Sequence, residues 1–233
     1  MTARASETQF AREETKCLGF VVGNGKIAPD FDKVKAIKNF PVCTSKKSVL
    51  AFFGVTGYYR RHIENYSQRA FPLTELTKKN KHDKFQMNGV ELAAFVDLRK
   101  ALISLPVLQP PNLGIPFTSK ANCSQFCCGA VLTQQNELGQ EHPIAYFANK
   151  FLPRETNFST VEKECLAVLL ALKNFKRYLF GVPVTIITDH NCLKWLMTMS
   201  PHNSRLMRWA LSLQRNNIVD IKFKPGVNNT DAE

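Results

Sequence analysis

The feature that most constrains the fold is a change in hydrophobic pattern on either side of a proline-rich segment, PVLQPP, at residues 106–111. Before this segment, apolar residues recur at the three- and four-residue spacing of amphipathic helices, in residues 29–40, 44–63 and 89–105. After it, short runs rich in β-branched residues alternate with helical stretches. Closely spaced prolines stiffen a chain and interrupt regular structure. We therefore predict a domain boundary at residue 110, between a mainly helical region and an α/β domain.

The first 28 residues and the start of the second domain both predict strands. Residues 1–28 contain an apolar run, a Gly-Asn-Gly turn and a short apolar return, which is typical of a hairpin. In the second domain, residues 115–121, 129–133 and 143–148 are candidate strands. Strands followed by a crossover helix and further strands predict a mixed sheet.

The clearest single element is a helix at residues 157–180, in which Ser159 and Glu162 form a capping box. Its apolar side, which is expected to pack on the sheet, consists of Val161, Cys165, Val168, Leu172, Phe175 and Leu179. A strand, two shorter helices and a last strand are predicted after it, at residues 182–189, 191–199, 204–214 and 217–226.

The chain carries a large positive charge. Lys and Arg number 31 and Asp and Glu 19, which gives a net charge of +12. Such an excess favours a polyanionic partner such as nucleic acid, because each neutralised phosphate releases counterions. The alternative is a charge that serves solubility alone. No apolar run approaches the roughly 20 residues that span a bilayer, and the first ten residues do not resemble a signal peptide. We therefore expect an intracellular protein, in the cytoplasm or nucleus, with no membrane partner.

The seven cysteines follow no disulfide or zinc-binding pattern. An odd number without CxxC spacing predicts reduced thiols. We expect Cys123, Cys127 and Cys128 to be small buried side chains and not metal ligands.

Four positions in the second domain could form one site. Glu164 lies in the first turns of the long helix, Asp189 ends a β-branched strand, and Asp231 follows the last strand. Asn122 ends the first strand of the domain. Carboxylates from separate elements that converge on one point can hold the two metal ions of a hydrolytic site. Each acid also has an ordinary interpretation, as a first-turn helix acid, a helix cap or a tail residue.

Several segments resemble Ty3/gypsy-type retrotransposon polyproteins in residue order and spacing. In the second half these are NFSTVEKECLAVLLALKNFKRYLFG, TIITDHNCLKWL, SRLMRWALSLQ and KFKPGVNNTDA. The resemblance implies a ribonuclease H-like domain at residues 111–233, with a mixed five-stranded sheet and flanking helices. In the first half, LAFFGVTGYYRRHIENYSQRAFPLTELTKK resembles a reverse transcriptase thumb, which implies a helical thumb/connection region at residues 29–110. Residues 1–28 resemble the end of the palm with its primer-grip hairpin.

The same resemblance implies a function, the hydrolysis of RNA in an RNA–DNA hybrid with two Mg²⁺ ions. Glu164, Asp189 and Asp231 would be metal ligands, and position 122 would supply the fourth. The rest of a Pol polyprotein would be a further partner. The implied nucleic-acid contacts are Tyr58, Tyr59, Arg60 and Arg61, together with Arg205, Arg208 and Trp209. Aromatic rings among arginines suit base stacking and phosphate contact, although Tyr58 and Trp209 could instead pack in the interior.

The chain departs from this family at the first acidic position. Where the family has Thr-Asp-Ala-Ser, the sequence reads ANCS, so Asn122 replaces the carboxylate, and Cys127 occupies the place of a turn glycine. An amide oxygen supplies no charge, and Mg²⁺ prefers carboxylates. This loss should lower the rate by a factor on the order of a thousand. We therefore expect RNA cleavage to be absent or barely detectable.

Two further departures concern the extent of the chain. No YxDD-type motif precedes the primer-grip segment, so the polymerase site is expected to lie outside this chain. The family's closing helix does not follow Asp231, so the second domain is expected to be truncated, as in a fragment of a polyprotein or a decayed genomic copy. Three functional hypotheses follow: a ribonuclease H, a non-catalytic nucleic-acid-binding remnant, or an inert product.

Overall fold

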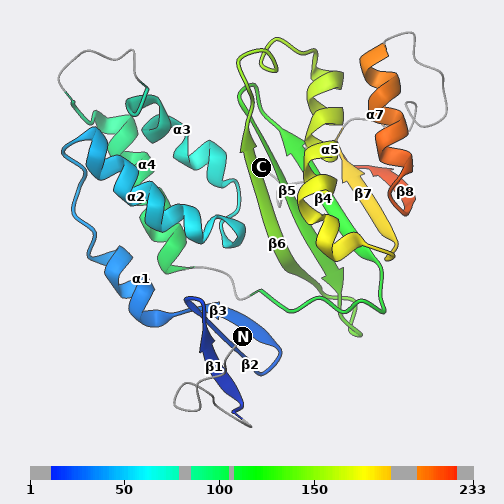
Figure 1. Ribbon diagram of the computed structural model, residues 1–233, viewed down its shortest axis with the longest axis horizontal. Coiled ribbons are helices and arrows are strands. Elements are labelled where there is room, and N and C mark those ends of the chain that lie inside the picture. Colours follow the sequence, from blue (N-terminus) through cyan, green and yellow to red (C-terminus); the bar gives the residue numbers. More distant parts are fainter. Residues whose placement is uncertain (1–11, 79–84, 105–107, 190–203, 225–233) are drawn as a thin grey trace, which may run out of the picture.

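The computed structural model describes residues 12–78, 85–104, 108–189 and 204–224. Figure 1 shows a small sheet near the N-terminus, a group of helices, and a larger sheet with two helices packed on it. Asp231 and the predicted helix at 191–199 lie outside the described residues.

The small sheet has three antiparallel strands, in the order β1 (Glu14–Cys17), β2 (Phe20–Gly23) and β3 (Lys26–Pro29). Asn24 and Gly25 have φ values of 49° and 65°, so a tight two-residue turn joins β2 to β3, as the Gly-Asn-Gly sequence predicted. The strand β1 was not predicted because its four residues are all exposed and show no apolar alternation.

The helical region contains more elements than the sequence predicted. Its elements are α1 (Phe31–Lys38), α2 (Lys46–Tyr58), the 3₁₀ helix η2 (Arg60–His62), α3 (Tyr66–Leu76) and α4 (Gly89–Ile103). The Asp30 side chain caps α1, and a capping box of Ser45 and Ser48 begins α2. The prediction of one helix over 44–63 was too long, because α2 ends at Tyr58 and the chain tightens into η2. The helix α3 was not predicted, and it tolerates Pro72 in its interior.

The helical region has a core of its own, to which every helix from α1 to α4 contributes. Among its fully buried side chains are Ile37, Phe52, Leu73, Phe95 and Leu98. Phe52 stands against Phe95 with ring centroids 4.6 Å apart.

The free energy of unfolding is expected to fall below pH 6.5 because His62 is buried in its neutral form. Its ring is buried and stacks on Phe20 at 4.8 Å, and burial, with the charge of Arg61, lowers the pKa of His62 from 6.5 to about 4. Between these values the unfolded chain binds more protons than the folded chain, so the free energy of unfolding falls as pH falls. The loss is about 1.4 kcal/mol per pH unit and about 3 kcal/mol in all.

Urea unfolding at pH 7 and pH 4.5 measures this loss. His62→Phe keeps an aromatic ring against Phe20 and removes the titrating group, so its loss should be smaller by about 3 kcal/mol. Equal losses in the two proteins would show that His62 is not the cause.

The larger sheet has five strands in the order β6-β5-β4-β7-β8. The strands are β4 (Phe117–Cys123), β5 (Cys127–Gln135), β6 (Glu141–Lys150), β7 (Val184–Thr188) and β8 (Ile218–Phe223). The β4–β5 and β5–β6 pairs are antiparallel, whereas β4–β7 and β7–β8 are parallel. The predicted α/β class with a mixed five-stranded sheet is therefore confirmed.

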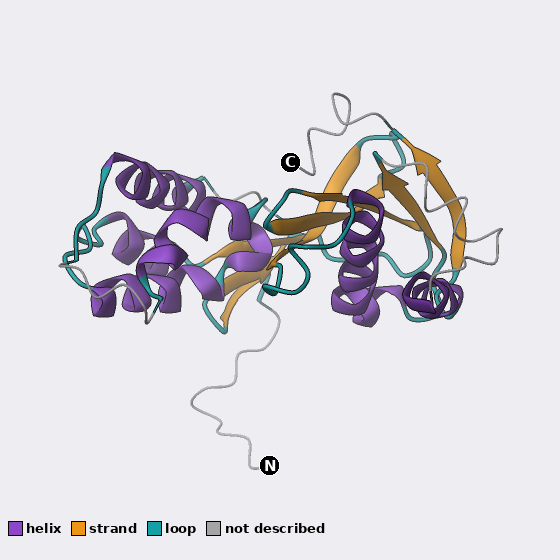
Figure 2. Cartoon of the chain, turned by 90° about the horizontal axis from the view of Figure 1, so that it is seen from above, coloured by secondary structure: helices purple, strands orange, loops and turns teal. Residues whose placement is uncertain are grey.

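Two helices, α5 (Thr160–Leu179) and α7 (Ser204–Gln214), pack on one face of this sheet (Figure 2). The predicted capping box of Ser159 and Glu162 begins α5. Five of the six side chains of its predicted apolar stripe are buried, and Val161 is partly buried against the same core. Ring contact between Phe175 and Phe147 of β6 helps to join helix and sheet.

The helical region packs on the other face of the sheet, along β5 and β6. Side chains alternate along a strand, so Ala148 points away from the α5 side that Phe147 faces, and it belongs to the helical core. Arg60 donates a hydrogen bond to the backbone oxygen of Ala148 at 2.6 Å, and Lys150 is paired with Glu75 of α3 at 2.7 Å. Along β5 and β6 the five-stranded sheet is thus covered on both faces.

Candidate active site

Asn122 and Asp189 lie at the same edge of the sheet. The parallel strands β4 and β7 pair Ser119 with Ile186 and Lys120 with Ile187. Two residues beyond the last pair on each strand are Asn122 and Asp189, so the register places them side by side at the carboxyl ends of the strands. Open α/β sheets usually carry their sites at this edge.

Glu164 reaches this edge from α5. Its side chain is buried, with 2% of its surface exposed, and one carboxylate oxygen, Oε1, accepts a hydrogen bond from Cys123 Sγ at 3.0 Å. Cys123 is the residue after Asn122, so α5 brings Glu164 to the end of β4. Burial raises the pKa of the Cys123 thiol, and the charges of Glu164 and Asp189 raise it further. The thiol therefore stays protonated, and it lies within the influence of both carboxylates.

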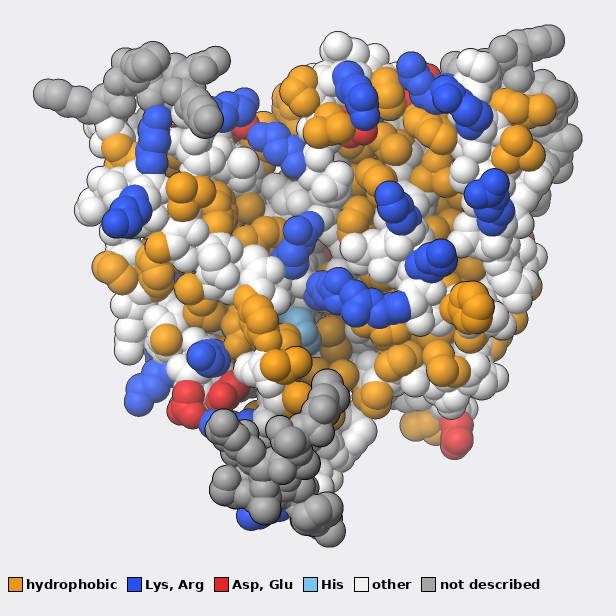
Figure 3. Space-filling model, in the orientation of Figure 1, with side chains coloured by type: hydrophobic (Ala, Val, Ile, Leu, Met, Phe, Trp, Pro, Cys, Tyr) orange, Lys and Arg blue, Asp and Glu red, His pale blue; other side chains and the backbone are white. Residues whose placement is uncertain are grey.

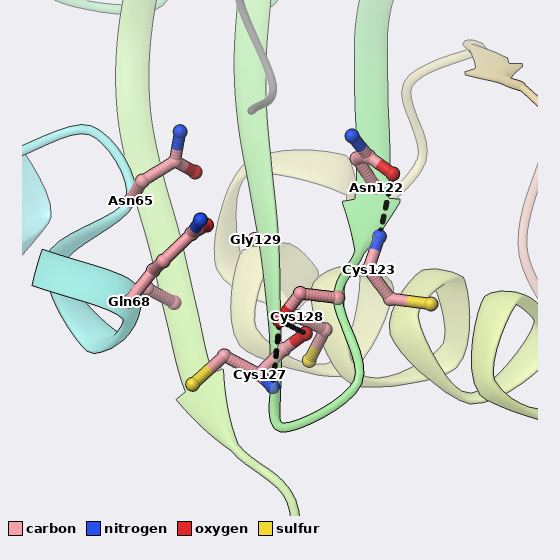
Figure 4. Close-up of a pocket in the computed structure, with 9 residues that line it drawn as sticks. Asn65, Gln68, Asn122, Cys123, Cys127, Cys128 and Gly129 are labelled. Carbon is pink, nitrogen blue, oxygen red and sulfur yellow. Dashed lines mark hydrogen bonds between the residues drawn. The ribbon is translucent and has the colours of Figure 1, made fainter. Parts of the chain in front are cut away.

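The Asn122 side chain is bonded to its own backbone neighbour. Its amide oxygen accepts a hydrogen bond from the backbone N–H of Cys123 at 2.7 Å. Alternation along β4 directs Asn122 to the face opposite Cys123. There it lines a cavity of about 170 Å³ with Asn65, the residue before α3, and Gln68 of α3 (Figure 4). The backbone of Asn122 therefore lies at the predicted site. Its amide oxygen, however, already accepts the hydrogen bond from the Cys123 backbone.

The described residues do not fit a two-metal site. Within the parts of the chain that the structure describes, no group of three or more His, Cys, Asp or Glu side chains is placed to hold a metal ion. Two carboxylates, Glu164 and Asp189, lie near this edge of the sheet, and position 122 has an amide. The fourth predicted ligand, Asp231, lies outside the described residues.

The cysteines near the site remain thiols. Burial raises the pKa of Cys127 to about 11 and that of Cys128 to about 12. The six described cysteines are all free, and four of them are buried. Cys127 and Cys128 are buried as predicted, whereas Cys123 is only partly buried and contacts Glu164.

The predicted contacts at residues 58–61 lie where the small sheet and the larger sheet meet η2. Tyr59 has 2% of its surface exposed, and its hydroxyl donates a hydrogen bond to the backbone oxygen of Gly19 at 3.0 Å. Tyr58 is about half exposed, stacks on Phe20 and donates to the backbone oxygen of Leu18. Tyr58 therefore packs on the small sheet, which was the alternative reading of its sequence. Arg60 and Arg61 are exposed, although Arg60 also bonds to the backbone of β6.

On α7 the predicted residues differ in their surroundings. Arg205 forms an ion pair with Glu162 at 2.9 Å and lies over the Phe158 ring at 4.3 Å. Trp209 is partly buried and packs near the same ring, at 6.0 Å between centroids. Arg208 is exposed.

The surface carries further cations that the sequence reading did not single out. Figure 3 shows Lys and Arg side chains spread over the face that includes α5 and α7, with few acidic side chains among them. Lys173, Lys176 and Arg177 are exposed on α5. Their three- and four-residue spacing, on the side away from the apolar stripe, was the signal that could have identified them.

No helix in the described ranges is long and apolar enough to cross a membrane.

Comparison with known proteins gives a family for the second domain. Residues 113–216 match the RNase H-like domain found in reverse transcriptase. The chain is 37% identical over 206 residues to the retrovirus-related Pol polyprotein from transposon 297 of Drosophila melanogaster, covering 88% of this chain and 19% of that protein. It is 33% identical over 237 residues to the corresponding polyprotein from transposon opus of the same species, covering 97% and 23%. The Tf2-3 polyprotein of Schizosaccharomyces pombe is 28% identical over 232 residues, covering 98% and 17%. The chain thus spans about a fifth of the length of these relatives.

Solved structures match the fold over almost the whole chain. A foamy viral protease-reverse transcriptase in complex with RNA/DNA hybrid has a TM-score of 0.77 at 20% identity, covering 96% of this chain and 31% of that one. The same viral protein in complex with dsDNA has a TM-score of 0.75 at 19% identity, covering 92% and 45%. The likeness includes the helical region as well as the larger sheet.

Proposed function

We propose that this chain, which contains the RNase H-like region of a retrotransposon Pol polyprotein, binds RNA–DNA hybrids through its basic surface and cuts their RNA strand very slowly or not at all. The observation that carries this proposal is Asn122. It stands beside Asp189 and close to Glu164, where a hydrolytic site needs a charged oxygen, and its amide oxygen is bonded to the Cys123 backbone. The rest of the ancestral site, two carboxylates at the end of a sheet, supports descent from a metal-dependent ribonuclease.

The domain assignment belongs to the same proposal. Residues 1–28 would be the end of a reverse transcriptase palm, residues 29–110 a thumb/connection region, and residues 111–233 the ribonuclease H-like domain of a Ty3/gypsy-type element. Two observations support this division. The helical region has its own hydrophobic core, and the small sheet packs on η2 through the stacking of Phe20 on His62. Polymerisation would require parts of a Pol polyprotein other than these.

The metal assignment is proposed from the family and not from the described site. Glu164, Asp189 and Asp231 are the side chains that would hold Mg²⁺, which prefers hard anionic oxygen ligands. With an amide at position 122, the described residues supply too little negative charge for two divalent ions.

Nucleic-acid binding is proposed for the exposed cations. Arg61 and Arg208 present their guanidinium groups to solvent, and Arg205 lies beside Arg208 on α7 while paired with Glu162. Tyr59 and Arg60 are assigned mainly to packing, because the hydroxyl of one and the guanidinium of the other bond to neighbouring backbone. Trp209 would support α7 from beneath and not stack on a base.

Filter binding and cleavage of one labelled RNA–DNA hybrid test the proposed function together. We expect binding with and without Mg²⁺, and little or no cutting of the RNA. Affinity should fall steeply with salt, by about a thousandfold between about 50 and 200 mM for about six phosphate contacts. Arg208→Gln should reduce the salt slope by about one, whereas Lys33→Gln, an exposed charge on α1, should leave it unchanged.

The other outcomes separate the competing hypotheses. Rapid cleavage of the RNA in Mg²⁺ would identify a working ribonuclease H and refute the interpretation of Asn122. Failure to bind or cut the hybrid would favour an inert product.

A further inference from the structure

We infer that Cys123 is a second obstacle to metal binding, because its thiol occupies the space beside Glu164 that a divalent cation would need. This inference rests on the proposed function, since it concerns the same ancestral site. It adds that restoring the carboxylate at position 122 would not by itself rebuild the site.

The contact between Cys123 and Glu164 carries the inference. Cys123 Sγ lies 3.0 Å from Glu164 Oε1 and donates its proton to that oxygen. Alternation along β4 turns Cys123 toward α5 and Asn122 toward α3, so the thiol and the altered position 122 do not share a face. The thiol is therefore a separate feature of the site, not a consequence of Asn122.

Asp189 reaches the same end of the sheet from the neighbouring strand. Asp189 follows β7, the strand next to β4, at the edge where Cys123 ends its strand. A cation held at this edge by Glu164 Oε1 would have to lie beside Cys123 Sγ, which is 3.0 Å from that oxygen. The thiol proton of Cys123 thus points at the Glu164 oxygen that a cation would bind.

The bond length and ligand preference of Mg²⁺ explain why a bound ion and the Cys123 thiol cannot both lie beside Glu164 Oε1. Mg²⁺ binds oxygen at about 2.0–2.1 Å and takes hard oxygen ligands in near-octahedral order. A protonated thiol is a poor ligand for such an ion, because soft sulfur suits other metals. With sulfur 3.0 Å from Oε1, an ion bound on the same side of that oxygen would meet the sulfur and its proton. The thiol must therefore turn away before the ion can enter.

The chain offers a matched control in the same hairpin. Cys127 and Cys128 are neighbours on β5, and Cys128 is the residue that pairs with Cys123 across the strands. Cys127 points to the opposite face, into the cavity lined by Asn65 and Gln68 (Figure 4). Cys127→Ala therefore removes a buried thiol from the same hairpin without touching Glu164.

The test is the affinity for Mn²⁺, measured by electron paramagnetic resonance on the full chain without nucleic acid. Mn²⁺ is a suitable probe because it shares the carboxylate preference of Mg²⁺. Cys123→Ala should tighten Mn²⁺ binding by about tenfold or more, the usual size of effects from groups that contact a metal ligand. Cys127→Ala should stay within about threefold of the unmodified chain.

An unchanged or weaker affinity in Cys123→Ala would overturn the inference. If the alanine variant fails to unfold cooperatively, Cys123→Gly also removes the thiol and is judged by the same criterion. Hybrid binding is measured in parallel on every variant. Loss of hybrid binding throughout, with tighter Mn²⁺ in Cys123→Ala, would refute the proposed function and leave the inference standing. Retained hybrid binding with unchanged Mn²⁺ affinity in Cys123→Ala would refute the inference about Cys123 and leave the proposed function standing.

Discussion

The double substitution Asn122→Asp with Cys123→Ala is expected to raise the rate of Mg²⁺-dependent RNA cleavage by about a thousandfold. The first change supplies the missing charge beside Asp189, and the second removes the thiol from Glu164. Single-turnover cleavage of a labelled RNA–DNA hybrid measures the rate. Asn122→Asp alone should recover only part of the gain, because the thiol still donates to Glu164.

Glu164→Gln in the double variant provides the control. It should abolish the gain, since it removes one of the two carboxylates that lie near the sheet edge. A double variant that cuts no faster than the unmodified chain, while binding Mn²⁺ more tightly, would place the remaining defect elsewhere in the chain.

Phe175→Ala is expected to lower the free energy of unfolding by about 3–5 kcal/mol. Phe175 is fully buried in α5 and contacts Phe147 of β6, with ring centroids 6.3 Å apart. Its removal would leave a cavity between helix and sheet, at the centre of the core that positions Glu164. Such a loss is a large part of the stability of an ordinary domain.

Urea unfolding followed by circular dichroism measures this effect. Lys176→Ala, an exposed position one residue further along α5, should change the free energy by no more than about 0.5 kcal/mol. A loss below about 1 kcal/mol for Phe175→Ala would mean that the α5–sheet contact is looser than its burial indicates.

Local patterns predicted most of the second domain. The apolar stripe of α5, its capping box and the β-branched strand β7 are each specified by residues close together in sequence, and all three are present. The misses share a different cause. The strand β1 is exposed, and α3 contains Pro72, so neither shows a strong local pattern, and both depend on neighbours that are distant in the chain.

The candidate site divides in the same way. The sequence suggested Asn122, Glu164 and Asp189 as candidates. The structure places Asn122 and Asp189 at one sheet edge, and Glu164 contacts Cys123 at the end of β4. The sequence could not identify the role of Cys123, because the contact with Glu164 joins residues 41 positions apart. The packing of Tyr59 against Gly19, 40 positions away, was hidden for the same reason.

The two-sided cover of the larger sheet has a practical consequence. Ala148 is buried in the helical core, Phe126 stacks on Phe71 of α3 at 5.1 Å, and Lys150 pairs with Glu75. Cutting the chain at the proline-rich segment would strip these partners away and leave an apolar flank of the sheet in water. A fragment that contains the ribonuclease H-like domain should therefore include the preceding helices, because they cover the second face of its sheet along β5 and β6.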